Sequence, residues 1–419
     1  MRSVVVTGLG FVTCLGNDAG SVSASLRAQR HGIRRFPALE IGNSPVHLAG
    51  VVGGFDVSST DQEDWTFPED MPRLRMEQLR SLAPHGAYAI HACNQAIADA
   101  GLTPEMLSAP ETGMYTASSG SSAMLYSNLD RMHRLGPRRC PPQGIVSSIA
   151  GTLSFNLISH FGITGASAGF VSACASSGHA LGHAYDEIAL GRQRRMIVVG
   201  AEDCNADTIL PFCSLRVLST SEDPDSASRP FDVKRDGFVG TGGAVTMILE
   251  DEGSALGRGA KIYARVVGWG QGSDGYHSMM PHPEGEGLAR AMRNALSSAG
   301  MAPSGIAYLN AHATSTQAGD VAELHAIRSV FGTGSGPAVS STKALTGHAL
   351  SLSSVMECAF TVLAMNESWM PASAHITELD PAADGIDVIR DTREGVYFTA
   401  MSNSSGFGGA NVSVIFKRA

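Results

Sequence analysis

Short apolar runs alternate along the chain with longer stretches whose apolar positions recur at helical spacing. In the first half, the runs that predict strands are Ser3–Thr7, Glu111–Ala117, Met196–Gly200 and Ala244–Glu250. The stretches that predict helices there are residues 80–100 and Cys174–Leu190. Strands that alternate with helices favour an α/β fold with crossover connections.

The same order of elements restarts after a polar, glycine-rich connector at residues 251–260, although no sequence repeat is visible. The predicted strands there are Ile262–Gly268, Ile306–Leu309, Val396–Met401 and Asn411–Phe416. The predicted helices are Gly287–Ala299, Asp320–Phe331 and Leu350–Met365. We therefore expect two halves, residues 1–255 and 256–419, with the irregular stretch Glu40–Arg75 as an inserted cap loop.

Composition and charge exclude several classes of protein. Hydrophobic residues make up 43% of the 419 residues and charged residues 16%, which permits a large core and argues against disorder. The net charge of −9 provides no general basic surface for nucleic acid. Two local basic runs, Arg131–Arg139 and Gly191–Arg195, are either solvated surface or a docking patch for an acidic partner.

The seven cysteines are widely spaced, and none forms a C-x-x-C pair. This pattern argues against a disulfide framework or a cysteine zinc site and favours a reducing compartment such as the cytoplasm. The N-terminal residues lack the apolar core of a signal peptide. No apolar run approaches the roughly 20 residues that a membrane-spanning helix needs, so we expect no membrane insertion.

Cys174 is the first candidate for chemistry, in the stretch FVSACASSGHALG. It lies where a strand-like run gives way to a helix-like one, and a helix start lowers the pKa of a thiol. Small neighbours leave room for a substrate. For this stretch alone, a buried structural cysteine is the commoner explanation.

Two histidines in the second half favour the catalytic explanation. His312 follows a predicted strand in YLNAHATSTQAGD, and His348 precedes a predicted helix in STKALTGHAL, with Lys343 shortly before it. Such junctions are where the sites of α/β proteins gather. A glycine-rich loop, Met401–Asn411, carries Phe407 and offers backbone N–H groups to a reacting oxygen.

Taken in order, the motifs resemble those of the β-ketoacyl-acyl carrier protein synthases of types I and II, in the thiolase superfamily. The resemblance covers essentially the whole chain. It rests on VVVTGLGFVTCLGN, VSACASSGHALG, SRPFDVKRDGFVGTGGA, IYARVVGWGQGSDG, YLNAHATSTQAGD, STKALTGHAL and SNSSGFGGANVSVIF. It implies a five-layered αβαβα thiolase fold built from two similar halves. It also implies an acyl carrier protein as partner, a homodimer or a heterodimer with a homologue, and no metal or redox cofactor.

The resemblance also implies residue roles. Cys174 accepts the acyl group as nucleophile, and His312 and His348 assist the decarboxylation of malonyl carrier protein. Lys343 supports the two histidines, and Glu357 lies on the helix that follows. Thr314 and Thr316 line the pantetheine tunnel. Phe407 is the gating aromatic, and its N–H joins that of Cys174 in an oxyanion hole.

Four departures from the family pattern bear on the substrate. Ala313 replaces a glycine, Gln317 a proline and Ser405 a phenylalanine, and ALSLSS at residues 349–354 replaces a run of glycine and alanine. Because of these changes, a specialised polyketide or polyene pathway is an alternative to fatty acid synthesis. The alignment also places Gly120 at the acyl pocket, and it makes Arg138 and Arg139 candidates for carrier-protein docking.

Other interpretations are weaker. GASAG would make Ser167 a hydrolase nucleophile, but the elbow motif follows a strand, whereas here it precedes one. His179 and His183 have zinc-like spacing without a third ligand. The N-terminal glycines lack the third glycine of a dinucleotide loop, since Thr13 stands there. A thiolase needs a second cysteine near the C-terminus, and none follows Cys358 here. Type III synthases pair one histidine with an asparagine, whereas this chain has His312 and His348. Chain-length factors lack the nucleophilic cysteine, which is present here as Cys174.

Overall fold

The strands form two halves of one long mixed sheet. The computed structural model describes all 419 residues, and ten strands join in the order β11-β10-β14-β15-β9-β1-β8-β6-β4-β5. The N-terminal half comprises β1 (Val4–Val12), β4 (Thr112–Ala117), β5 (Ser167–Phe170), β6 (Arg195–Glu202) and β8 (Gly243–Asp251). The C-terminal half comprises β9 (Ala264–Ser273), β10 (Tyr308–Asn310), β11 (Ala338–Ser340), β14 (Thr399–Gly406) and β15 (Ala410–Arg418).

The two halves repeat one pairing pattern. In each half the last strand in chain order, β8 or β15, runs antiparallel between the first and the fourth. The fourth strand is parallel to the second, and the second to the third. The halves meet where β1 pairs antiparallel with β9. This duplication, which no sequence repeat revealed, confirms the expectation of two similar halves.

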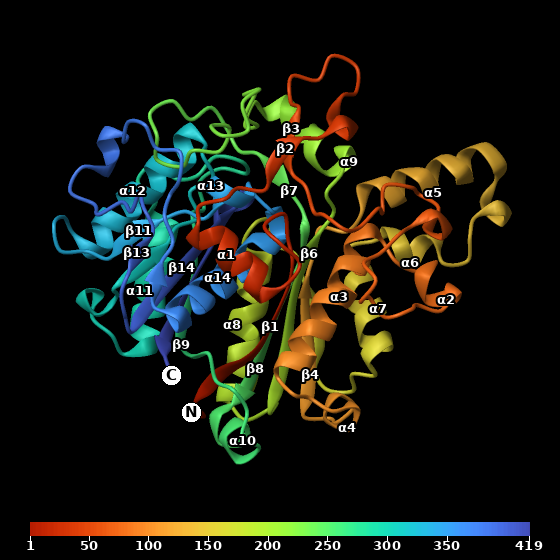
Figure 1. Cartoon of the computed structure of the whole chain (residues 1–419), viewed down its shortest axis with the longest axis horizontal. Helices are drawn as coiled ribbons and strands as arrows, with labels where there is room; N and C mark the ends of the chain where they lie inside the picture. The colour runs from red at the N-terminus through yellow and green to blue at the C-terminus, as the bar shows by residue number, and fades with distance from the viewer.

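Helices complete five layers. In Figure 1, α3 (Pro84–Asp99) and α7 (Thr152–Phe161) cover the outer face of the N-terminal half, and α11 (Glu286–Ala299) and α12 (Gln317–Phe331) cover that of the C-terminal half. Between the halves lie α8 (Ser176–Ala189) and α14 (Ser353–Glu367), which contact each other and strands of both halves. The predicted five-layered fold is therefore confirmed.

The position of each helix follows from its sequence. Every residue of α14 from Ser353 to Met365 is buried, as expected for a helix packed on all sides. The outer helix α11 buries a single apolar stripe. Gly182 lets α8 approach the C-terminal half, because a Cβ at that position would lie 2.2 Å from the Trp269 ring. The central layer thus depends on small residues as much as on apolar ones.

Most of the remaining elements are shorter. The helices are α1 (Ala19–Arg27), α2 (Met76–Leu79), α4 (Pro104–Leu107), α5 (Ser122–Leu135), α6 (Gly144–Ser148), α9 (Ala206–Ile209), α10 (Glu252–Gly257) and α13 (Lys343–Thr346). The strands are β2 (Ile33–Arg35), β3 (Leu48–Gly50), β7 (Gly240–Thr241), β12 (Trp369–Met370) and β13 (Arg393–Glu394). No helix has the length and apolar character required to cross a bilayer.

The predicted strand at Ser3–Thr7 was too short. β1 continues through Gly8 and Gly10 to Val12, because these glycines face α3, where a Cβ at Gly10 would lie 1.9 Å from the Ala92 carbonyl oxygen. The glycines therefore serve close packing inside a strand, so the dinucleotide-loop interpretation is wrong. The helix predicted from Leu350 begins at Ser353, after the 3₁₀ turn η6 (Leu350–Leu352), in which Leu350 has φ 49°.

Candidate active site

Cys174 lies in the turn between β5 and α8, just before the helix begins. Ala173 has φ 50°, a left-handed conformation that is uncommon for a residue with a side chain. The Cys174 carbonyl oxygen accepts a hydrogen bond from Ser354 Oγ at 3.2 Å. The turn thereby presents the thiol to the second half of the chain.

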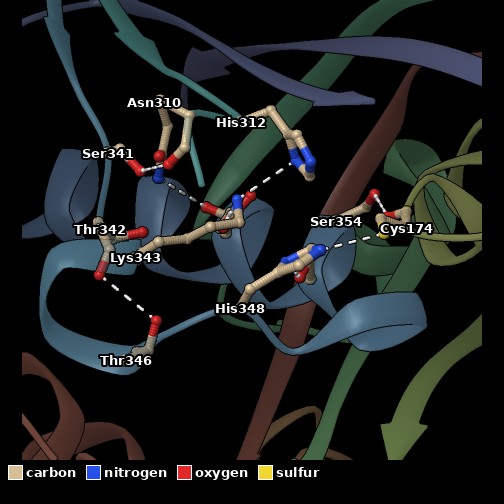
Figure 2. A network of polar contacts seen from close by, with 12 residues as sticks. Cys174, Asn310, His312, Ser341, Thr342, Lys343, Thr346, His348 and Ser354 are labelled. Atoms are coloured by element: carbon tan, nitrogen blue, oxygen red, sulfur yellow. Dashed lines mark hydrogen bonds and ion pairs between the residues drawn. The ribbon is translucent and has the colours of Figure 1, made fainter. Parts of the chain in front are cut away.

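His348 reaches the thiol from that second half. Its Nε2 lies 3.0 Å from Cys174 Sγ (Figure 2). The histidine follows α13 and Gly347, and its backbone is bonded on both sides: its N–H donates to Val239, and its carbonyl accepts from Thr241. The Phe238 ring packs edge-on against the imidazole at 5.2 Å. Backbone and aromatic contacts together hold the ring beside the sulfur.

His312 completes a pair of imidazoles. It follows β10, and its ring centroid lies 5.2 Å from that of His348, with the planes nearly perpendicular. Its Nδ1 lies 3.3 Å from Lys343 Nζ. An ammonium only donates hydrogen bonds, so this contact leaves the His312 proton on Nε2.

Lys343, labelled in Figure 2, forms a fully buried ion pair with Glu357 of α14. Burial raises the pKa of Glu357 to about 7, and the charge of Lys343 opposes that shift. Both side chains are fully buried, so no solvent reaches them. The pair fixes a positive charge behind His312.

Burial decides the protonation states of the pocket. It lowers the pKa of His312 and His348 well below 6.5, and Lys343 acts in the same direction. Both rings are therefore neutral near pH 7. Burial raises the pKa of Cys174 to about 12, although Lys343 opposes this rise. The expected lowering at the helix start is thus outweighed, and the thiol must lose its proton as it reacts.

Sequence reasoning missed Glu323 on α12. Its carboxylate accepts the N–H of His312 at 2.9 Å and that of Ala313 at 2.6 Å. Asn403 Nδ2 donates to the same carboxylate at 3.2 Å. Asp320, three positions earlier, accepts the N–H of Ser315. The D-x-x-E spacing in AGDVAELHA puts both acids on one helix face and was the available signal.

A cavity of about 350 Å³ opens onto the reacting groups and is lined by both halves of the chain. The predicted site residues that line it are Cys174, His312, His348, Thr314, Thr316, Ser405 and Phe407. The Thr314 and Thr316 hydroxyls lie 3.1 Å apart. The Phe407 ring is 39% exposed and packs 6.0 Å from Phe212. A Cβ on Gly406 would lie 2.9 Å from the Cys174 nitrogen, so the Phe407 loop closely approaches the nucleophile.

Three further predicted residues neither line this cavity nor belong to the Lys343–Glu357 pair behind it. Arg138 and Arg139 are exposed on the 3₁₀ turn η3 (Pro137–Arg139). Gly120 has φ 87°, and a Cβ there would lie 3.1 Å from the Ala150 backbone. The backbone conformation alone therefore accounts for glycine at this position.

The competing sites are not assembled. Ser167 is exposed in β5 and has no histidine or carboxylate partner. His183 packs between Phe170 and Trp269, and His179 Nδ1 bonds the Ser172 hydroxyl at 2.8 Å. No group of three histidine, cysteine or acidic side chains is arranged to hold a metal ion.

The structure also shows the surroundings of the residues that depart from the family pattern. Ala313 is buried in an ordinary backbone conformation, and the Gln317 amide donates to the Arg235 carbonyl. Ser405 lines the cavity, and its side chain is small and polar. The hydroxyls of Ser351, Ser353 and Ser354 bond to Glu202, His348 and the Cys174 carbonyl, respectively.

Comparisons with known proteins agree along the whole chain. The family described as Beta-ketoacyl synthase, N-terminal domain, matches residues 1–255, and its C-terminal domain matches residues 263–377. The 3-oxoacyl-[acyl-carrier-protein] synthase 1 of Haemophilus influenzae is 37% identical over 100% of this chain and 99% of its own length.

Solved structures agree as well. A β-ketoacyl synthase from Burkholderia phymatum is 36% identical, with a TM-score of 0.91 and complete coverage of both chains. The ishigamide ketosynthase/chain length factor is 28% identical, with a TM-score of 0.89 over 100% of this chain and 99% of that one.

Proposed function

This chain belongs to the β-ketoacyl synthase family of acyltransferases, and we propose that it joins an acyl chain on Cys174 to malonyl carrier protein in fatty acid biosynthesis. The reaction is a decarboxylative Claisen condensation. The observation that carries the proposal is the meeting of three groups from both halves: the Cys174 thiol, 3.0 Å from His348 Nε2, and the His312 ring beside it.

The first step transfers the acyl group. Cys174 Sγ attacks the thioester carbon of an acyl-pantetheine, and His348 Nε2 takes the thiol proton and passes it to the departing pantetheine sulfur. The backbone N–H groups of Cys174 and Phe407 bind the oxyanion. Thr314 and Thr316 offer hydroxyls to the pantetheine arm. The products are an acyl-enzyme and a free carrier thiol.

The second step forms the carbon–carbon bond. Malonyl thioester loses CO2, and Nε2–H groups of His312 and His348 bind the developing enolate oxygen. The enolate carbon attacks the acyl carbon, and the Cys174 thiolate leaves and is protonated. Lys343 holds the His312 tautomer, and Glu357 holds Lys343. The chain supplies each of these groups itself, so the proposal assigns no metal or redox cofactor.

Replacing the nucleophile tests this function. Cys174→Ala is expected to abolish the radiolabelled acyl-enzyme and β-ketoacyl product, whereas Cys140→Ala, outside the cavity, is expected to retain both. A Cys174→Ala enzyme that still condenses acyl and malonyl carrier proteins contradicts the proposal.

The partner is an acyl carrier protein, as the name of the Haemophilus influenzae relative indicates for that enzyme. Arg138 and Arg139 remain our proposed docking residues, because carrier proteins are acidic. Arg216 joins them, since it is exposed at the rim of the cavity. Charge reversal at a true docking residue raises the KM for the carrier protein and spares acylation by small thioesters.

We propose that the chain dimerises through β5. This strand is at the edge of the sheet, α7 contacts it, and α6 packs on α7. Exposed apolar side chains lie along this region: Ile145 and Ile149 on and after α6, Phe155 on α7, and Val171 after β5. A homodimer is the simplest assembly. A heterodimer with a homologue is the alternative, because the ishigamide protein is described as a ketosynthase together with a chain length factor.

A specialised polyketide or polyene pathway is the second candidate function. Ser405 favours it, because a small polar residue in the cavity where the family has phenylalanine enlarges and wets the malonyl site. Gly120 stays a prediction for the acyl pocket. Turnover of a panel of saturated, unsaturated and β-oxygenated acyl carriers separates the pathways: a preference for saturated chains supports fatty acid synthesis.

We also propose that residues 1–255 act as the nucleophile-bearing half and residues 256–419 as the histidine-bearing half. The repeated strand pattern supports this division, because α10 joins the last strand of one half to the first strand of the other.

A further inference from the structure

The turn after His348 contains three serines where the family has glycine and alanine. Ser351, Ser353 and Ser354 are all buried, and each hydroxyl has a hydrogen-bond partner. Ser351 bonds the Glu202 carboxylate, and Ser354 bonds the Cys174 carbonyl. Only the Ser353 hydroxyl contacts a reacting side chain, that of His348.

The Ser353 hydroxyl extends the contact between cysteine and histidine into a row of three groups. Ser353 Oγ lies 3.0 Å from His348 Nδ1. The other ring nitrogen, Nε2, lies 3.0 Å from Cys174 Sγ, a contact drawn in Figure 2. Ser353 is the first residue of α14 and is fully buried. No other group bonds Nδ1, so this hydroxyl is the hydrogen-bond partner of that nitrogen.

The two histidines therefore differ in what supports them. His312 Nδ1 faces the Lys343 ammonium, which only donates, so His312 keeps its proton on Nε2. A hydroxyl both donates and accepts. Ser353 consequently supports either neutral tautomer of His348, with no change in the position of the ring.

We infer that Ser353 is a positioning residue that lets His348 act as a proton acceptor in acyl transfer and as a hydrogen-bond donor in condensation. The inference rests on the proposed function. In acyl transfer Nδ1–H donates to Ser353 Oγ, and Nε2 takes the Cys174 proton and gives it to the pantetheine sulfur, which leaves the ring neutral.

Condensation uses the other tautomer. The ring loses its Nδ1 proton to solvent and gains one at Nε2, and the Ser353 hydroxyl turns to donate to Nδ1. Nε2–H then binds the enolate oxygen beside His312. When the Cys174 thiolate leaves, it takes a proton from water in the cavity, and the ring returns to the Nδ1–H tautomer by exchange with solvent. One proton is consumed per turnover, as loss of CO2 from the malonyl carboxylate requires.

A matched pair of variants tests the inference. Ser353→Thr keeps the hydroxyl and Ser353→Val replaces it by a methyl of the same size. We expect Ser353→Val to lower the kcat of condensation on the order of tenfold, the effect of one lost buried hydrogen bond. The KM for both carrier thioesters stays unchanged, and both half-reactions slow. Ser353→Thr is expected to retain the kcat of wild type.

Ser351→Ala serves as control, because it removes another buried hydroxyl of the same turn that bonds Glu202 and not the histidine. It is expected to lower stability and leave kcat unchanged. Ser353→Ala, which restores a residue type of the family, gives a third measurement if the larger side chains disturb folding.

The experiment distinguishes a failure of this inference from a failure of the proposed function. A wild-type enzyme that forms no acyl-Cys174 overturns both. A wild type that acylates normally, with Ser353→Val or Ser353→Ala at wild-type kcat, overturns the inference alone. An equal loss of kcat in Ser351→Ala also overturns it, since the effect is then not transmitted through His348.

Discussion

Lys343 carries the buried positive charge around which the polar groups of the site are arranged. It pairs with Glu357, lies 3.3 Å from His312 Nδ1, and acts on the pKa of Cys174 and of both histidines. A buried ion pair contributes little net stability, but removing one partner leaves an uncompensated charge. Lys343 thus links the stability of the central layer to the chemistry.

Lys343→Met is expected to lower the free energy of unfolding by about 3–5 kcal/mol and to abolish malonyl decarboxylation, because Glu357 loses its partner and His312 its tautomer. Glu357→Leu added to it is expected to restore most of the stability but none of the activity. Chemical denaturation and CO2 release measure the two effects. Recovery of decarboxylation in the double variant would show that Lys343 has no role beyond stability.

The pH profile follows from the histidines. Burial and Lys343 lower the pKa of His312 and His348 well below 6.5, so both rings stay neutral at pH 6.5 and above and are protonated only at lower pH. We expect protonation of the histidines to add no acid limb to kcat for condensation above pH 6.5. Because burial raises the pKa of Glu357 to about 7, a limb near pH 7 is assigned to that carboxyl and is expected to be absent from Glu357→Gln. An acid limb with its midpoint at or above pH 6.5 that persists in Glu357→Gln contradicts the assigned electrostatics.

The reacting residues and two of their supports, Lys343 and Glu357, were predictable from sequence motifs, but the supports Glu323 and Ser353 were not. Cys174, His312 and His348 occur in short motifs that carry chemistry. Glu323 and Ser353 do not, because each acquires its meaning from a backbone group or a ring nitrogen that only the folded chain brings within hydrogen-bond distance. The pKa of Cys174 was also misjudged, since burial by the other half of the chain is invisible in the local stretch.

The central helix α8 shows the same limit at the scale of elements. Its periodicity predicted a helix, but only the structure explains Gly182, over which the Trp269 ring of β9 lies. Likewise SNSSG in β14 reads as a polar loop, yet it pairs with β15 up to Gly406. Buried polar strands beside a site break the apolar pattern on which prediction depends.

Gly182→Ala tests the close approach of α8. The added Cβ would lie 2.2 Å from the Trp269 ring, so we expect a loss of about 1–3 kcal/mol in the free energy of unfolding. Gly257→Ala at the end of α10 is the control, because nothing lies within 4 Å of its Cβ position. A helical glycine in open space gains about 0.4–1 kcal/mol from alanine. Equal effects of the two substitutions in thermal unfolding would refute this packing.

At the scale of the whole molecule, the exposed end of the sheet predicts assembly. Val171 follows the edge strand β5 and is 66% exposed, and Val396 precedes β14 in the other half and is 61% exposed. The two side chains are both exposed valines. Only Val171 lies beside β5, at the proposed interface.

Val171→Asp is therefore expected to shift the sedimentation mass from dimer to monomer, because a charge would be buried against the partner. Val396→Asp is expected to leave the dimer intact. A wild-type chain that sediments as a monomer, or equal dissociation by both variants, contradicts pairing through β5.

Intact-mass analysis of the acyl-enzyme tests the central claim most directly. Incubation with an acyl carrier protein is expected to add one acyl group, mapped by peptide digestion to Cys174. Malonyl carrier protein is then expected to discharge it, yielding free enzyme, CO2 and a β-ketoacyl carrier extended by two carbons. An acyl group found on another residue, or an acyl-Cys174 that malonyl carrier protein does not discharge, would contradict the account.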